Sequence, residues 1–187
     1  ISGNWTLNTP TPNAGNAAAT LAPATDLAIN EWLANPVPGQ EDWIELFNKN
    51  ASLPVSLQGI YLATSNNLFR LAALSFLPPL GYAQLFADEG VGPDHLDFKL
   101  LAGGGSIVLS DATGSPVQTV VYGAQSEGVS QGYLPDGGTA VLSFVGSASP
   151  KSPNHILSYN GPVLNEVLAR NRSVSVGGNT TGHCGSY

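Results

Sequence analysis

The chain has 187 residues, a formal net charge of −7 and only 10% charged residues. Its six Lys and Arg residues are scattered and cannot form a phosphate-binding stripe, which argues against nucleic acid and anionic lipid surfaces as partners. The apolar stretches are too short and too interrupted to cross a bilayer, which argues against membrane insertion. The single cysteine, Cys184, excludes an internal disulfide framework and a Cys-based zinc site.

The start of the chain contains one short apolar alternation, at Trp5 and Leu7, followed by a stretch rich in Pro, Asn, Gly and Ala. This pattern predicts a short strand followed by a linker. From Leu27 onward, short apolar runs alternate with polar residues and are bounded by Gly, Pro, Asn, Asp or Ser. The main runs are LAINEWLAN, DWIELFNKN, VSLQGIYLAT, LFRLAAL, GYAQLFAD, FKLLAG, SIVLSD, VQTVVYGA and TAVLSF.

Turn signals recur about every ten residues along these runs, which is typical of many short strands. No window shows a helical stripe bounded by caps, so the pattern predicts an all-β sandwich or barrel. We expect two packed antiparallel sheets with twelve side chains directed into the core. These are Leu27, Ile29, Ile44, Leu46, Leu57, Ile60, Leu62, Leu85, Leu100, Val108, Val121 and Leu142.

An internal repeat is the most informative pattern in the chain. The segment LAINEWLAN at 27–35 matches PVLNEVLARN at 162–171, and the Asn-Glu pair that begins at Asn30 recurs at Asn165. Similar linkers precede the two copies, TPTPNAGN at 9–16 and ASPKSPN at 148–154. The simplest interpretation is a tandem array whose unit is about as long as the spacing between Asn30 and Asn165.

The array predicts three parts. Residues 1–22 would be the end of a preceding repeat plus a linker, residues 23–155 a complete domain, and residues 156–187 the opening strand of the next repeat plus a flexible tail. The chain contains no methionine, so we expect a processed product or a piece of a longer protein. Apolar strands at both ends should not stay unpaired, so we expect them to pair with each other or with a neighbouring copy, giving a possible oligomer.

The complete unit resembles a lamin-tail domain in its bacterial form. The resemblance rests on LAINEWLAN, DWIELFNKNASLPVSLQGIYL, DHLDFKLLAGGGSIVLSDATGSPVQTVVYG, SEGVSQGYLPDGG and SPKSPN, which follow in that order between positions 27 and 154. It implies an immunoglobulin-like β-sandwich. It also implies an interaction module, often an accessory part of large secreted or surface proteins, with no established catalytic residues to carry over.

The sequence around each candidate catalytic group argues against a catalytic role. A nucleophilic triad would need Ser or Cys with His and a carboxylate, but His183 and Cys184 are neighbours in a glycine-rich tail. Glu31 and Glu45 could form a carboxylate pair for glycoside chemistry. Because both lie on short alternating strands, we interpret them instead as outward-facing or turn-capping residues near a sheet edge.

The densest acidic stretch, FADEGVGPDHLDF, contains four carboxylates on a Gly- and Pro-rich loop: Asp88, Glu89, Asp94 and Asp97. Hard oxygen ligands of this kind suit calcium, so these four residues are the candidate metal site, although they do not fit the EF-hand pattern. The alternative is a solvated loop with Asx turns. Zinc through His95 alone is the weaker alternative. No other cofactor is expected.

Tyr133, in QGYLPDGG, is the aromatic residue most expected to be exposed, whereas the other strand aromatics are expected in the core. Taken together, the sequence predicts a non-catalytic binding, adhesion or spacer module of an extracellular or cell-surface protein. Its partners would be a protein or carbohydrate ligand and the neighbouring repeat units. The alternatives are an accessory carbohydrate-binding module and a hydrolase-associated domain.

Overall fold

The structure is a computed structural model and describes residues 6–72, 75–157, 174–176 and 180–182. The chain divides into two units, residues 1–157 and residues 158–187. In the second unit the described residues form one hairpin of β15 (Val174–Val176) and β16 (Thr180–Gly182). The strand predicted at 162–169, Trp5, His183 and Cys184 lie outside the described residues.

The all-β prediction is confirmed in the first unit, whose described residues contain strands and a single 3-10 turn, η1 (Ala24–Asp26). The larger sheet has six strands, in the order β10-β9-β4-β3-β13-β14, and every pair except β10 with β9 is antiparallel. Its strands are β3 (Leu27–Leu33), β4 (Asp42–Asn48), β9 (Tyr82–Ala87), β10 (His95–Leu96), β13 (Ser130–Tyr133) and β14 (Val141–Phe144).

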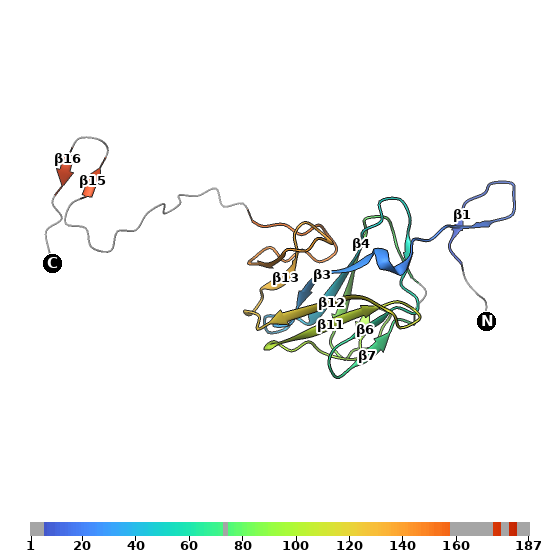
Figure 1. Cartoon of the computed structure of the whole chain (residues 1–187), viewed down its shortest axis with the longest axis horizontal. Coiled ribbons are helices and arrows are strands. Elements are labelled where there is room, and N and C mark those ends of the chain that lie inside the picture. Colours follow the sequence, from blue (N-terminus) through green and yellow to red (C-terminus); the bar gives the residue numbers. More distant parts are fainter. Residues whose placement is uncertain (1–5, 73–74, 158–173, 177–179, 183–187) are drawn as a thin grey trace. The chain divides into compact units, whose positions relative to one another are not determined.

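The smaller sheet has four antiparallel strands in the order β12-β11-β6-β7 and lies against the first sheet, with β12 beside β3 (Figure 1). Its strands are β6 (Tyr61–Ala63), β7 (Leu68–Arg70), β11 (Gly104–Ser110) and β12 (Pro116–Gly123). Two short pairs complete the unit. They join β5 (Val55–Ser56) to β8 (Phe76–Leu77), and β1 (Asn8–Thr9) to β2 (Ala17–Ala18). The stretch that the sequence predicts as a linker therefore contains a small hairpin.

The core lies between the two sheets, and nine of the twelve predicted core side chains are buried there, with exposed fractions from 0% to 5%. The other three predictions are wrong. Val108 is half-buried, Val121 is 80% exposed and Leu142 is 39% exposed. The first two follow or precede another branched apolar residue, so alternation alone did not fix the phase of those strands. Leu142 lies on β14, an edge strand with little sheet around it.

Two glutamines join β3 to the smaller sheet without strand pairing. The Gln118 side chain, from β12, accepts a hydrogen bond from Ile29 N at 2.7 Å. Gln125, just after β12, accepts from Ala34 N at 2.6 Å and donates to Trp32 O at 3.3 Å. These side chains satisfy backbone groups of β3 that would otherwise be buried without partners.

A β-bulge in β3 determines which of its side chains lie on the outer face of the larger sheet. Opposite β4, Ile29 pairs with Leu46 and Glu31 pairs with Glu45, so Asn30 is the extra residue. An extra residue shifts the alternation of a strand by one position. Ile29 and Trp32 therefore both enter the core, while Asn30 and Glu31 both lie on the opposite, outer face of the sheet.

Candidate functional site

The outer face of the larger sheet carries a network of three carboxylates, the buried Glu31 and Glu45 and the half-buried Asp136, which we call the carboxylate network. Glu31 and Glu45 are both 0% exposed and lie on the central strands β3 and β4. These two glutamates lie on the outer face, as expected, but they are neither turn-capping nor near a sheet edge, and they are buried. The physical reason is that the segment 134–154, distant in sequence from both strands, folds over this face and seals it.

Glu45 is held by one bond from the sheet and one from the covering segment. Asn30 Nδ2 donates to its Oε1 at 3.0 Å, and the backbone N of Lys151 donates to its Oε2 at 2.5 Å. Burial raises the pKa of Glu45 from 4.5 to about 7, although these two hydrogen bonds act in the opposite direction. The nearby carboxylates of Glu31 and Asp136 raise it further, because like charges disfavour ionisation.

Glu31 is enclosed in the same way. Ser130 Oγ donates to its Oε1 at 2.5 Å, and the backbone N of Ser149 donates to its Oε2 at 3.2 Å. Burial also raises the pKa of this carboxyl group, while the serine bonds lower it.

Asp136 completes the network from the loop after β13. Its Oδ1 accepts from Asn30 Nδ2 and from the backbone N of Asn154, both at 2.9 Å, and its Oδ2 accepts from the Tyr82 hydroxyl at 2.8 Å. The Asn154 side chain donates to the carbonyls of Tyr133 and Asn30, at 2.8 and 3.2 Å. Every carboxylate in the network is thus engaged with backbone or side-chain donors.

In this arrangement the two glutamates bind backbone amides of the covering segment and are closed to a substrate. A glycosidase pair needs an open cleft between its two carboxyl groups, but Glu31 and Glu45 are sealed and fully hydrogen-bonded. Sequence reasoning missed Asp136, Ser149 and Asn154 altogether. The signal in the sequence was the Asn-Glu pair, which recurs at Asn165 in the segment that matches 27–35.

The acidic loop does not bring its four predicted calcium ligands together. Asp88 accepts bonds from Gly90 N and from His95 Nδ1, each at 2.8 Å, while the other three carboxylates accept no hydrogen bond from the described residues. Burial opposes the effect, but these bonds hold the pKa of Asp88 below its usual value. Asp94 Oδ1 lies 3.7 Å from His95 Nε2, and Glu89 and Asp97 are exposed.

Across the described residues, no three His, Cys, Asp or Glu side chains are placed so that they could hold a metal ion. The loop is therefore not preassembled for calcium. Calcium binding at Asp88, Glu89, Asp94 and Asp97 stays a prediction.

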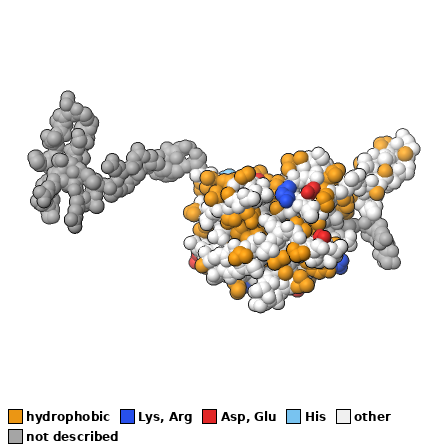
Figure 2. All heavy atoms as spheres, viewed as in Figure 1, with side chains coloured by type: hydrophobic (Ala, Val, Ile, Leu, Met, Phe, Trp, Pro, Cys, Tyr) orange, Lys and Arg blue, Asp and Glu red, His pale blue; other side chains and the backbone are white. Residues whose placement is uncertain are grey.

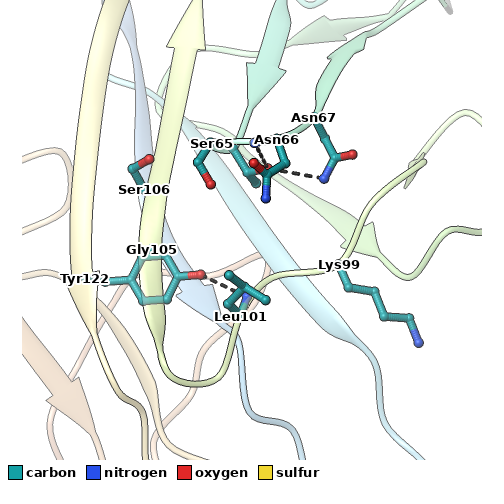
Figure 3. Close-up of a pocket in the computed structure, with 9 residues that line it drawn as sticks. Ser65, Asn66, Asn67, Lys99, Leu101, Gly105, Ser106 and Tyr122 are labelled. Atoms are coloured by element: carbon teal, nitrogen blue, oxygen red, sulfur yellow. Dashed lines mark hydrogen bonds between the residues drawn. The ribbon is translucent and has the colours of Figure 1, made fainter.

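A small polar hollow lies at one end of the smaller sheet (Figure 3). Its volume is about 60 Å³, and its lining comes from the β6–β7 turn, the start of β11 and the end of β12. The lining residues are Thr64, Ser65, Asn66, Asn67, Lys99, Leu101, Gly105, Ser106 and Tyr122. The lining offers hydroxyl and amide groups and, from Lys99, an ammonium group, but no carboxylate or imidazole, so it can bind a polar group through hydrogen bonds.

Tyr122 forms the floor of this hollow. Its hydroxyl accepts from Leu101 N at 3.2 Å, and the ring crosses over Gly105, where a Cβ atom would lie 3.3 Å from the hydroxyl. The prediction that Tyr133 is exposed is only half right. It is half-buried and packs against the core edge-on to Trp32, with ring centroids 6.0 Å apart.

The described residues contain no helix long and apolar enough to span a membrane. Two packed antiparallel sheets with a core between them define an immunoglobulin-like β-sandwich. Within that class, the family model of the Lamin Tail Domain matches residues 20–124, more than half of the chain. The chain therefore belongs to the lamin-tail-domain family. A comparison with curated proteins gave no match.

Proposed function

We propose that this lamin-tail domain is a non-catalytic module of a larger extracellular or cell-surface protein, where it binds a partner or spaces other domains. The observation that carries the proposal is the state of its best acid–base pair. Glu31 and Glu45 are both fully buried, and each is used to hold the backbone of the covering segment. A carboxylate in that position stabilises a scaffold and cannot reach a substrate.

The repeat supports the same proposal. Units strung in an array can extend a chain or present many copies of a binding surface, and neither role needs an active site in each unit. The neighbouring repeat units are then the first partners of the domain. The low content of charged residues and the single cysteine suit an extracellular setting without prescribing one.

The polar hollow favours a second candidate, an accessory carbohydrate-binding role. Amide and hydroxyl groups beside an aromatic ring are typical of sites that fix a neutral polar ligand. Because the hollow holds only about 60 Å³, it would receive one substituent of a sugar while the rest of the ligand lay across the rim. Asn66 and Ser106 are the side chains to change first.

Two assays on the full chain test the proposal. Chromogenic glycosides and esters should show no turnover above the buffer rate, and turnover that disappears in Glu45→Gln would overturn the non-catalytic assignment. An array of neutral oligosaccharides tests the second candidate. Binding that is lost in Asn66→Ala and kept in Asn16→Ala, an exposed asparagine between β1 and β2, supports it; no binding on the array removes it.

A further inference from the structure

Residues 147–154, which we call the strap, cross the outer face of the larger sheet. Only Ser147, Ser149 and Asn154 of the strap are buried, and it contains no large apolar side chain apart from its prolines. The strap therefore gains little from apolar burial, and hydrogen bonds must provide most of its attachment to the sheet.

Three backbone amides of the strap each donate to a different carboxylate, of which two are buried and the third, Asp136, is half-buried. Ser149 N donates to Glu31, Lys151 N to Glu45 and Asn154 N to Asp136. Lys151 has a positive φ of 67°, a conformation that costs energy for a residue other than glycine and is kept here by that bond. The strap is thus attached at three points, and each point ends on an ionisable group.

Within the part of the chain that the structure describes, the neighbours of the carboxylate network are acidic groups, and no cation forms an ion pair with it. Facing Glu45 are Glu31 from β3, Asp136 from the loop after β13, and the Tyr82 hydroxyl from β9. From the strap itself only the backbone of Lys151 reaches it, and the side chain of that residue is exposed. Among the described residues, ion pairs are formed only by His95, which lies on the edge strand β10 of the same sheet and pairs with Asp88 and Asp94. The stem of the Lys49 side chain lies against Gly137, next to Asp136, and Lys49 forms no ion pair with any residue that the structure describes.

We propose that the strap is a pH-sensitive latch, which is held on the sheet while the buried pair Glu31 and Glu45 retains a proton and is released more easily once both are charged. In the closed state their two negative charges would share one dry site beside Asp136. In the open state water would solvate each of them, so ionisation favours opening. The pKa of Glu45, raised by burial to about 7, places this change near neutral pH.

The matching linker at 9–16 indicates that the carboxylate network, and not the sequence of the linker, sets the conformation of the strap. That stretch lies in the β1–β2 hairpin, and its Asn16, the counterpart of the buried Asn154, is exposed. The same kind of sequence is therefore a strap only where carboxylates receive its amides. The latch goes beyond the proposed function, because it concerns how the unit closes and needs no bound partner.

Hydrogen exchange on the full chain tests the latch. The amides of Ser149, Lys151 and Asn154 are followed from pH 5 to pH 8.5, corrected for the intrinsic exchange rate and compared with the amides of β4. We expect protection of the three strap amides to fall by up to about 70-fold over this range, the change that pKa values of 4.5 and about 7 for Glu45 in the open and closed states give between pH 5 and pH 8.5. Protection of β4 should stay higher than that of the strap at every pH, because the strap opens without unfolding of the sheet.

Two variants separate the latch from general loosening. Glu45→Gln removes the ionisable group and one acceptor, so strap protection should be lower at acidic pH and its dependence on pH should be shallower. Lys151→Gly keeps the N–H and relieves the positive φ, so protection should rise at every pH with an unchanged midpoint. If Glu45→Gln does not fold, a carboxyl NMR titration of the unmodified chain gives the midpoint of Glu45 directly.

The latch is overturned by any of three results. The first is strap protection that does not change between pH 5 and pH 8.5. The second is protection of the strap amides equal to that of the β4 amides at every pH, which would mean that the strap opens only when the domain unfolds. The third is a Glu45 midpoint near 4.5 in the NMR titration.

Discussion

Replacing Asn30 by alanine should destabilise the domain more than its size suggests. The Asn30 side chain donates to Glu45 Oε1 at 3.0 Å and to Asp136 Oδ1 at 2.9 Å, and its Oδ1 accepts from Gly137 N at 2.9 Å. Alanine removes all three bonds at once. It leaves the buried Glu45 and the half-buried Asp136 each short of a donor, and one backbone N–H without its partner.

The magnitude follows from these bonds. A hydrogen bond to a charged group contributes about 1.5–3 kcal/mol and a neutral one about 1 kcal/mol, so the sum is about 4–7 kcal/mol. Water can enter the space left by the amide and solvate part of what is exposed, which reduces the loss. We therefore expect the free energy of unfolding to fall by about 4 kcal/mol.

Urea unfolding followed by tryptophan fluorescence measures this change, because Trp32 and Trp43 are both buried. Asn67→Ala is the matched control. It makes the same chemical change at an exposed residue whose amide bonds only to Thr64 Oγ1, and it should cost under about 0.5 kcal/mol. A loss below about 1 kcal/mol for Asn30→Ala would show that the network does not hold the domain closed.

Four further outcomes are expected. Because the pKa of Glu45 is raised, this residue contributes stability that is complete below pH 4.5 and is lost as the pH rises through about 7. The free energy of unfolding should therefore fall by up to about 3 kcal/mol between those pH values. A urea midpoint that does not change over this range contradicts the prediction. Ile44→Ala should lower the free energy of unfolding by about 2–5 kcal/mol, and Val121→Ala, at a residue that is 80% exposed, by under about 0.5 kcal/mol. Equal shifts of the urea midpoint would contradict the assignment of Ile44 to the core. Calcium at millimolar concentration should raise the melting temperature if the loop of Asp88 and Asp94 binds it, and a flat calorimetric titration ends that prediction. Deleting residues 156–187 should leave the domain folded and weaken association; monomers of both lengths in light scattering would exclude pairing between copies.

Most of the fold could be predicted because it depends on local pattern. The alternation in 27–33 and 42–48 gave both central strands, and Ile29, Ile44 and Leu46 face the core as expected. The predicted side-chain orientation was wrong where the hydrophobic pattern did not distinguish the two faces of a strand. Beside Val108 and Val121 the chain has consecutive apolar residues, and both strand phases then fit the sequence equally well.

The carboxylate network could not be predicted from local pattern, because its members meet across long separations in sequence. Glu31 binds Ser149, and Glu45 binds the backbone of Lys151. An alternating strand with a polar residue facing out has the same sequence whether that residue meets water or a covering segment. Every residue of β3 and of β4 is buried, which is a property of the layers above them and not of the strands.

The repeat and the bulge together give the Asn-Glu pair a structural meaning. In β3 the bulge is the feature that turns Asn30 and Glu31 to the same face, where one ties two carboxylates together and the other receives the strap. The pair recurs at Asn165 in a segment that matches β3, and the strap has its counterpart at 9–16. Each element is incomplete alone, since a bulge without a strap exposes a glutamate and a strap without the glutamate loses its amide partner. We therefore expect that, in the predicted tandem array, each unit keeps or loses the Asn-Glu pair and the strap together.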